Sequence, residues 1–381
     1  MPKTRKKVLL SLLCLVALYI VWLSFHLISF KTYKTPEEPS TRLEIKGAYH
    51  IHSTFSDGKK SVEKIAEAAA RSSLDFCILT DHGSPNYKSM DSQGWKKGIL
   101  VLAGSELSVS RGHLVALDFK EPQENFSQNA ELAAYRINQL NGFSIIAHPY
   151  SKTHWTWGEY AGYSGIEIIN ADSMVKRNYF PLLAYLPALL IEPEFPLLKI
   201  MRYPEKNLKK WDMLNKEFTV YAYYATDAHL LYRPLFSLLR IHVPLEENLS
   251  TGFEKAKNQI FHALRNGRFY NSIDAAAPAD GFQFWGEAGE KRIYMGESHP
   301  FNKSISLFIK TPDSIACKTV LIHNENPVLI GTDNSVSFNP PEPGVYRVEV
   351  YLQERTPLSK NCPWILSNPI FLREKTHGKN Q

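Results

Sequence analysis

The stretch Gly47-Ala48-Tyr49-His50-Ile51-His52-Ser53-Thr54-Phe55-Ser56-Asp57-Gly58 decides the fold of this chain. It is typical of a short strand that ends in two histidines and continues into a polar turn. On an extended strand the side chains of His50 and His52 lie on one face, because successive side chains alternate. Both imidazoles can therefore reach one metal ion, and Asp57 follows in the turn. A His-x-His motif is common by chance, so its meaning depends on the residues downstream.

Downstream, predicted strands repeatedly begin or end at histidines and carboxylates. Strands are expected at residues 45–50, 75–80, 99–103, 113–117, 143–147, 166–169 and 218–225, and helices at 61–73 and 130–140. The possible metal ligands beside these strand ends are His50, His52, Asp57, His82, Glu106, His113, His148, Asp227 and His229. Alternating strands and helices favour a parallel α/β architecture, and functional groups at strand ends favour a barrel with its site at that end. The pattern predicts a metal centre.

The motifs are His50-x-His52 with Asp57, Thr80-Asp81-His82, Glu106, Gly112-His113, His148-Pro149 and Asp227-x-His229. Their types and order, between residues 45 and 244, resemble the polymerase and histidinol phosphatase (PHP) superfamily of metal-dependent phosphoesterases. The resemblance implies an α/β fold, a distorted (β/α)7 barrel, with a trinuclear site. It implies three ligand sets, which are His50, His52, Glu106 and Asp227; Glu106, His113 and His148, with Glu106 bridging; and Asp57, His82 and His229.

The donor chemistry indicates the reaction. Imidazole and carboxylate ligands without thiolate suit Zn, Mn or Fe. Two ions roughly 3.5–4 Å apart can activate a water and clamp the oxygens of a phosphate ester. We therefore expect two or three divalent ions and hydrolysis of a phosphomonoester or phosphodiester by a metal-bound hydroxide. Asp57, His82 and His229 are expected to be catalytic through the third ion.

Two other functions stay open at this point. One is a non-catalytic metal-containing binding or assembly protein, and the other is an amidohydrolase-type hydrolase. A protein that had lost its enzymatic activity should also have lost metal ligands. Every expected ligand is present here, which favours an active enzyme. Candidate substrate contacts are Arg111, Lys152 and His154, because they flank the ligands His113 and His148. The sequence does not identify the ester.

Residues 8–30 form an apolar run without charged residues. At about 1.5 Å per residue the run is long enough for a bilayer core of about 30 Å, so we expect it to be an uncleaved transmembrane anchor. Basic residues precede it, which predicts a cytoplasmic tail at 1–7 and an extracytoplasmic catalytic domain, periplasmic or at the cell surface. A cleaved signal peptide is the alternative. Residues 31–44, rich in proline and polar residues, are expected to be a linker.

The remaining chain divides into two regions that differ in residue composition and sequence pattern. Residues 45–275 are the predicted barrel, interrupted at 172–212 by an insertion that is either a small packed helical segment or a flap that touches lipid or covers the substrate. Residues 276–381 consist of short β-branched and aromatic runs, typical of an all-β sandwich. Cys317 and Cys362 are either a disulfide or two free thiols. A net charge of +6 without a basic stripe gives no indication of nucleic acid. The oligomeric state cannot be read from the sequence.

Overall fold

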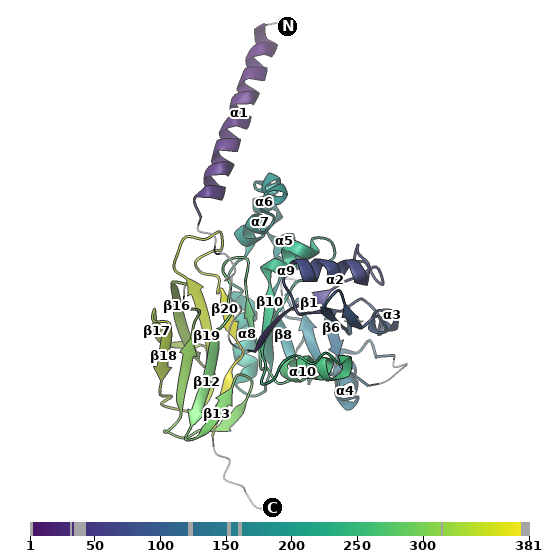
Figure 1. Ribbon diagram of the computed structural model, residues 1–381, viewed down its shortest axis with the longest axis vertical. Coiled ribbons are helices and arrows are strands. Elements are labelled where there is room, and N and C mark those ends of the chain that lie inside the picture. Colours follow the sequence, from purple (N-terminus) through teal and green to yellow (C-terminus); the bar gives the residue numbers. More distant parts are fainter. Residues whose placement is uncertain are drawn as a thin grey trace, which may run out of the picture.

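The computed structural model describes residues 3–30, 33, 43–120, 125–150, 154–158, 162–313 and 315–374. Lys152 and most of the predicted linker lie outside these residues. The helices are α1 Lys3–Ile28, α2 Val62–Arg71, α3 Tyr87–Met90, α4 Ala130–Gln139, α5 Ala171–Arg177, α6 Tyr179–Leu183, the 3-10 helix η1 Leu186–Leu190, α7 Glu194–Ile200, α8 Glu205–Asn215, α9 Tyr232–Leu238 and α10 Phe253–Arg265. Figure 1 shows α1 extending away from a mixed α/β body.

The strands form three sheets. A five-stranded sheet contains β5 Ser105–Val109, β6 Gly112–Leu117, β7 Phe143–Ala147, β8 Gly165–Asn170 and β9 Tyr221–Ala225. A four-stranded sheet contains β12 Gln283–Ala288, β13 Lys291–Tyr294, β15 Ser306–Lys310 and β18 Ser335–Phe338. A twelve-stranded sheet contains β1 Glu44–Ile51, β2 Phe76–Leu79, β3 Gly94–Lys96, β4 Ile99–Ala103, β10 Arg240–Pro244, β11 Tyr270–Ser272, β14 Ser298–Pro300, β16 Cys317–His323, β17 Asn326–Gly331, β19 Gly344–Leu352, β20 Ile365–Ser367 and β21 Ile370–Arg373.

The expectation of an all-parallel α/β sheet is wrong in part. β1, β2 and β4 pair in parallel, as do β7, β8 and β9. However, β6 runs antiparallel to both β5 and β7, and β10 runs antiparallel to β1. The short connection between β5 and β6 explains the reversal, because a parallel pair needs a long crossover. As a result the first residues of β6 lie beside the carboxyl end of β7, with His113 opposite Ala147.

The two sheets that carry the predicted ligands touch at their edges. Isolated bridges join Ile51 to Ala228 and His82 to Glu106. The strand ends are further tied by the backbone amide of Thr226, which donates to the carbonyl of Tyr49 at 3.0 Å. The ends of β1, β2, β5 and β9 are therefore held together.

The helix between β1 and β2 follows its sequence pattern. Val62, Ile65, Ala66 and Ala69 of α2 are buried on one face, as the helical spacing predicts. Ser61 occupies the N-cap position with an extended backbone, although its side chain makes no capping hydrogen bond. Strands β2 and β4 are buried throughout their length, which explains their continuous apolar sequence.

The C-terminal region is all-β, as expected, but its strands continue the large sheet. β20 pairs with β11, which in turn pairs with β10. A buried ion pair joins the same region to α8, where Arg347 Nε lies 2.6 Å and Nη2 2.7 Å from the two carboxylate oxygens of Asp212. Arg347 Nη1 also lies 2.6 Å from Glu349. Cys317 and Cys362 are both buried free thiols, so the disulfide alternative is not realised.

Replacing Arg347 by methionine is expected to lower the free energy of unfolding by about 3–5 kcal/mol, because the buried carboxylates of Asp212 and Glu349 lose their partner. Urea denaturation of the two proteins measures the difference. Arg292→Met is the matched control, since Arg292 is exposed and stacks on Trp285 at the surface. A loss at Arg347 no larger than at Arg292 would contradict the importance of this contact.

Candidate metal centre

The structure brings all nine predicted ligands together. Their ligand atoms fall into overlapping groups in which every atom lies within 4.8 Å of the others. The groups are His50, His52 and Asp227; His50, Glu106 and His148; His82, Glu106 and His113; and His52, Asp57, His82 and His229. Six imidazoles and three carboxylates thus meet at the joined strand ends.

One group has the spacing of a metal coordination shell. His50 Nε2 lies 3.1 Å from His52 Nε2, and each of these atoms lies 3.2 Å from Glu106 Oε2. Asp227 Oδ1 lies 3.5 Å from His50 Nε2 and 3.4 Å from His52 Nε2. Ligands about 2.1 Å from a tetrahedral ion are about 3.4 Å apart. The four atoms therefore fit the donor set of a divalent ion such as zinc.

Glu106 connects this group to a second one. Its Oε1 lies 2.8 Å from His113 Nδ1 and 2.9 Å from His148 Nε2, while its Oε2 faces the first group. The carboxylate is almost completely buried, with 1% of its side chain exposed. A buried carboxylate that presents one oxygen to each of two imidazole groups fits a bridging ligand.

The third group, which contains Asp57, His82 and His229, is more exposed to solvent. Asp57 Oδ2 lies 3.3 Å from His229 Nε2 and 3.8 Å from His82 Nε2. Within the described residues, His82 Nδ1 is buried without a hydrogen-bond partner and lies 3.3 Å from Glu106 Oε2. The side chains of Asp57, His82 and His229 are 54%, 33% and 28% exposed, whereas those of His50 and His52 are fully buried. The third group therefore faces the solvent.

The backbone at the ligands is not that of regular strands. His50 has φ of 63°, Asp227 49° and His148 29°, all in the left-handed region that side chains rarely adopt. The pairing of β1 with β2 shifts register between Tyr49 and Ile51. The expected alternation along an extended strand is thus wrong as the reason that His50 and His52 converge. A bulge turns both rings to one side, and such strain is typical of functional sites.

Glu167 of β8 supports the ligands from behind, and the sequence prediction missed it. Its Oε1 lies 2.6 Å from His50 Nδ1, and its Oε2 accepts from the backbone amide of His148 at 2.7 Å. Asn170 donates to Glu167 Oε2 at 2.9 Å and to Asp227 Oδ2 at 3.1 Å. When His50 donates Nδ1–H to Glu167, the lone pair on Nε2 points into the cluster. A single acid inside the apolar run 165–170 was the available signal.

Asp81 fixes the turn that carries Asp57. Its buried carboxylate accepts from the amide of Ser53 at 2.7 Å and from the hydroxyls of Ser56 and Ser89, both at 2.6 Å. These contacts hold the loop between β1 and α2 against the end of β2. Asp81 therefore positions the solvent-facing group without pointing into the cluster.

The crowding of charges shifts the pKa values of the cluster. Burial alone would lower the pKa of His52, but hydrogen bonds to Asp227 and Glu106 outweigh it and raise the pKa to about 9. Burial would also lower the pKa of His50. The carboxylates of Glu167, Asp227 and Glu106 outweigh it and raise the pKa well above its ordinary value. Despite burial, the neighbouring histidines lower the pKa values of Glu106 and Asp227. The carboxylates are therefore ionised, as metal ligands must be.

Of the predicted substrate contacts, the structure brings one to the cluster. Arg111 lines a cavity of about 290 Å³ together with His113 and His148, and its Nε lies 2.6 Å from Glu131. His154 is exposed and does not line this cavity. Lys176 of α5 was missed by the sequence prediction. Its pairing with Asp172 raises its pKa, and the charges of Asp227 and Asp57 add to this effect.

Comparison with known proteins gives a family match for the part of the chain that carries seven of the nine predicted ligands. Residues 48–190 match the family model of the PHP domain, so this part of the chain is a PHP domain, as the motifs predict. No curated protein matches the sequence.

Three solved structures can be compared with this chain. A two-domain protein containing a predicted PHP-like metal-dependent phosphoesterase from Bacteroides vulgatus is 16% identical, with 89% of this chain and 98% of that chain covered and a TM-score of 0.46. A metal-dependent phosphoesterase, so described, from Bifidobacterium adolescentis is 14% identical, with 60% and 98% covered and a TM-score of 0.34. An amidohydrolase from Chromobacterium violaceum with bound sulfate is 17% identical, with 48% and 87% covered and a TM-score of 0.32.

Because Glu106 contacts two ligand groups, Glu106→Gln is expected to weaken metal binding in both, whereas Asp57→Asn is expected to weaken it only in the solvent-facing group. Each variant, saturated with Mn and freed of excess ion, is measured by elemental analysis. Glu106→Gln should hold fewer ions per chain than Asp57→Asn. Equal metal content in the two variants would contradict the bridging position of Glu106.

Glu167→Gln is expected to reduce metal affinity by about 10–100-fold, because a carboxylate that orients a ligand histidine increases its basicity. Titration of the metal-free protein with Zn, followed by calorimetry, measures the affinity. Glu131→Gln is a matched control, since Glu131 pairs with Arg111 rather than with a ligand. Unchanged affinity in the Glu167 variant would show that Glu167 serves packing alone.

Proposed function

We propose that the protein is a metal-dependent phosphoesterase that hydrolyses a phosphomonoester or phosphodiester at a trinuclear site. The observation that carries the proposal is the spacing of the ligand atoms around Glu106, which fits bridged divalent ions. One ion would be held by His50, His52, Glu106 and Asp227, the second by Glu106, His113 and His148, and the third by Asp57, His82 and His229. Mn, Zn and Fe all suit these donors.

Bound ions would supply Lewis acidity toward the phosphate oxygens and lower the pKa of a coordinated water. The protein's own residues set where this chemistry takes place. His50 and His52 are fully buried, so a substrate cannot reach them directly. The exposed edges of Asp57, His82 and His229 leave the solvent-facing group as the place where an ester arrives. We therefore assign the catalytic role to these three residues.

A phosphate group also needs cationic partners from the protein. Arg111 lines the cavity next to His113 and is held in place by Glu131. Lys176 lies on the helix that follows β8 and interacts electrostatically with Asp227 and Asp57. We propose both as contacts of the phosphate oxygens. Lys152 and His154 remain weaker candidates, the first because it lies outside the described residues and the second because it is exposed away from the cavity.

We propose the finer architecture on the same basis. The two sheets that meet at the bridges Ile51–Ala228 and His82–Glu106 would act as a distorted (β/α)7 barrel. Residues 45–275 would form the catalytic unit, with the insertion at 172–212, and residues 276–381 a β-sandwich that supports it. The strand pairs and the Arg347–Asp212 contact between these regions favour one rigid assembly.

We further propose that α1 anchors the protein in a membrane, with residues 1–7 cytoplasmic and the catalytic unit extracytoplasmic. Residues 5–28 of α1 are long and apolar enough to cross a bilayer. Leu23 of α1 is buried against Ala188 and Phe195 of the insertion, and removal of α1 as a signal peptide would uncover these residues. The basic residues before position 8 favour the proposed orientation.

The decisive experiment compares wild type with Asp57→Asn, each reloaded with Mn, Zn or Fe and checked for folding by circular dichroism. Wild type is expected to hydrolyse p-nitrophenyl phosphate or bis-p-nitrophenyl phosphate, and to stop when EDTA removes the ions. Asp57→Asn is expected to lower kcat by roughly 100-fold or more, since a lost ligand removes several kcal/mol of charge stabilisation. Asp313→Asn, the same change at an exposed site in the C-terminal region, should have no effect.

The other functional classes predict different outcomes of this experiment. Wild type that is inactive on phosphate esters but releases product from an amide or a lactone would be an amidohydrolase-type hydrolase. Metal-loaded protein that is inactive on every ester, amide and lactone would favour a binding or assembly role.

A further inference from the structure

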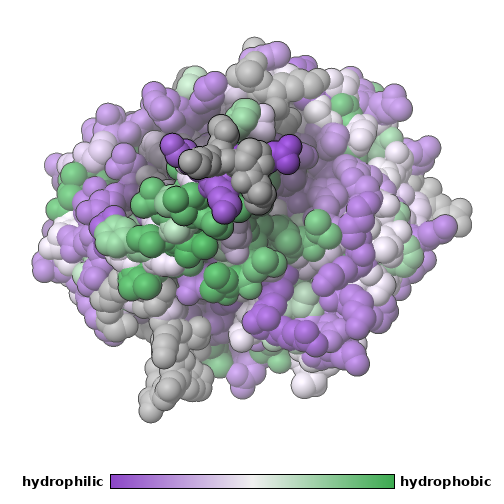
Figure 2. Space-filling model, turned by 90° about the horizontal axis from the view of Figure 1, so that it is seen from above, coloured by the Kyte–Doolittle hydropathy of each residue, from purple (hydrophilic) through white to green (hydrophobic). Residues whose placement is uncertain are grey.

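The insertion carries an exposed apolar surface, here called the α6–η1 surface. Its side chains are Tyr179, Phe180, Leu183, Leu186, Leu190 and Ile191, with exposed fractions of 48%, 70%, 51%, 42%, 92% and 69%. Figure 2 looks onto the face from which α1 extends and shows apolar side chains gathered on that face. Charged residues bound the surface in sequence, with Arg177 before it and Glu192 after it. Six large apolar side chains this exposed on one short segment need a covering partner.

Residues 179–191, which carry this surface and are here called the α6–η1 segment, are packed against α1, the helix that we propose to cross the membrane. Tyr19 Oη donates to the carbonyl of Ala184 at 2.9 Å. The rings of Trp22 and Tyr185 stack with their centroids 5.3 Å apart, and Leu23 is buried beside them. The exposed apolar surface is therefore continuous with the surface of the apolar helix.

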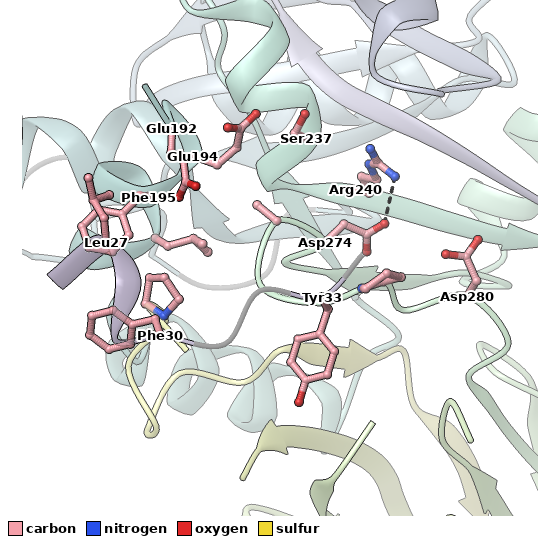
Figure 3. Close-up of a pocket in the computed structure, with 14 residues that line it drawn as sticks. Leu27, Phe30, Tyr33, Glu192, Glu194, Phe195, Ser237, Arg240, Asp274 and Asp280 are labelled. Atoms are coloured by element: carbon pink, nitrogen blue, oxygen red, sulfur yellow. Dashed lines mark hydrogen bonds and ion pairs between the residues drawn. The ribbon is translucent and has the colours of Figure 1, made fainter. Parts of the chain in front are cut away.

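The far end of α1 sets the depth of the segment. Figure 3 shows Leu27 and Phe30 lining a cavity of about 280 Å³ together with Phe195 and the ion pair of Arg240 and Asp274. Charged groups of this kind belong outside the hydrocarbon layer. If the layer ends near Leu27, Trp22 and Tyr19 lie about 8 and about 12 Å inside it. Ala184 and Tyr185, which connect α6 to η1 and contact Tyr19 and Trp22, lie at a similar depth, within the outer half of the layer.

We propose that the α6–η1 segment lies in the outer leaflet of the membrane beside α1, with its exposed apolar side chains in contact with lipid acyl chains. The protein thus has two membrane contacts, a spanning helix and an interfacial segment. The second contact fixes how the body is oriented on the membrane, which a single helix with a linker does not.

The orientation bears on the substrate, an extension that rests on the proposed function. Asn170, the last residue of β8 just before the insertion, has a side chain that contacts both Glu167 and Asp227 of the metal centre. Only the seven-residue helix α5 separates this point from the α6–η1 segment, a length of about 10 Å. Figure 1 shows α5 and α9 on the side of the body from which α1 extends. We infer that this arrangement holds the metal centre close to the headgroups and that the substrate is a phosphate ester carried by a membrane lipid.

The depth of the segment can be measured without any enzymatic activity. Single cysteines are introduced by Leu183→Cys and by Leu190→Cys into full-length protein in which Cys14 is replaced by alanine, and a nitroxide label is attached. The protein is reconstituted in phosphatidylcholine vesicles, and collision with oxygen and with a water-soluble nickel chelate is recorded. Leu132→Cys on α4 is the matched control, since Leu132 is 58% exposed on another part of the body.

Labels at positions 183 and 190 are expected to collide readily with oxygen and poorly with the chelate, as labels in acyl chains do. The label at position 132 is expected to show the reverse. Labels at 183 and 190 that behave like the one at 132 would overturn the proposal. Shielding from both reagents would also overturn it, because a second copy of the chain or another protein would then cover the surface.

A second measurement separates the lipid substrate from the proposed function. Leu183→Glu and Leu190→Glu together are expected to lower hydrolysis of phosphatidic acid in vesicles about tenfold or more and to leave hydrolysis of p-nitrophenyl phosphate unchanged, because charge opposes insertion. Equal loss on both substrates, or none on either, would contradict the lipid substrate class. Wild type that is inactive on both of these monoesters and also on bis-p-nitrophenyl phosphate contradicts the proposed function and its lipid extension. The label depths then decide the membrane contact alone.

Discussion

The carboxylate of Glu106 is the constraint on which the rest of the site depends. It is buried among imidazoles that approach both of its oxygens, so it cannot be neutral without losing most of its contacts. An ionised buried carboxylate needs positive charge nearby. Without metal, that charge comes from protons on His50 and His52. The pKa of His50 is raised by the carboxylates of Glu167, Asp227 and Glu106, and that of His52 by Asp227 and Glu106. Divalent ions would replace those protons, which couples metal binding to proton release.

The fold positions the ligands of this cluster at strand ends and in locally strained backbone. Antiparallel β6 brings His113 to the carboxyl end of β7, beside His148. His50 and Asp227 have left-handed backbone, which turns their side chains toward the cluster. A regular strand would not point both of them there. Buried supports, Glu167 and Asp81, hold the rings and the turn in these positions. The cost of the strain is offset by the packed strands around it.

The metal ligands and several elements of the fold could be predicted from the sequence, for a physical reason. Metal ligands must be particular residue types at strand ends, so His50, His52, Asp57 and the later motifs were visible as a set. The helical periodicity of α2 was equally clear, because burial of one face imposes it. The apolar run of α1 and the all-β texture of the C-terminal region were visible for the same kind of reason.

What could not be predicted depends on contacts between distant residues. Glu167 is one acid in an apolar strand, and only the fold places it 2.6 Å from His50. The reversal of β6 depends on a short connection whose conformation the sequence does not reveal. The contact of Tyr19 with Ala184 joins residues far apart in the chain, so no local pattern predicts that α1 packs against the insertion.

The central claim is that Glu106 bridges bound ions. Anomalous diffraction at the Mn edge from crystals of the Mn-loaded protein tests it most directly. The account predicts a peak about 2.1 Å from His50 Nε2, His52 Nε2 and Glu106 Oε2, and a second peak near His113 and His148 that shares Glu106 through Oε1. A metal-loaded crystal without a peak at Glu106, or with a single ion bound only at Asp57, would contradict it.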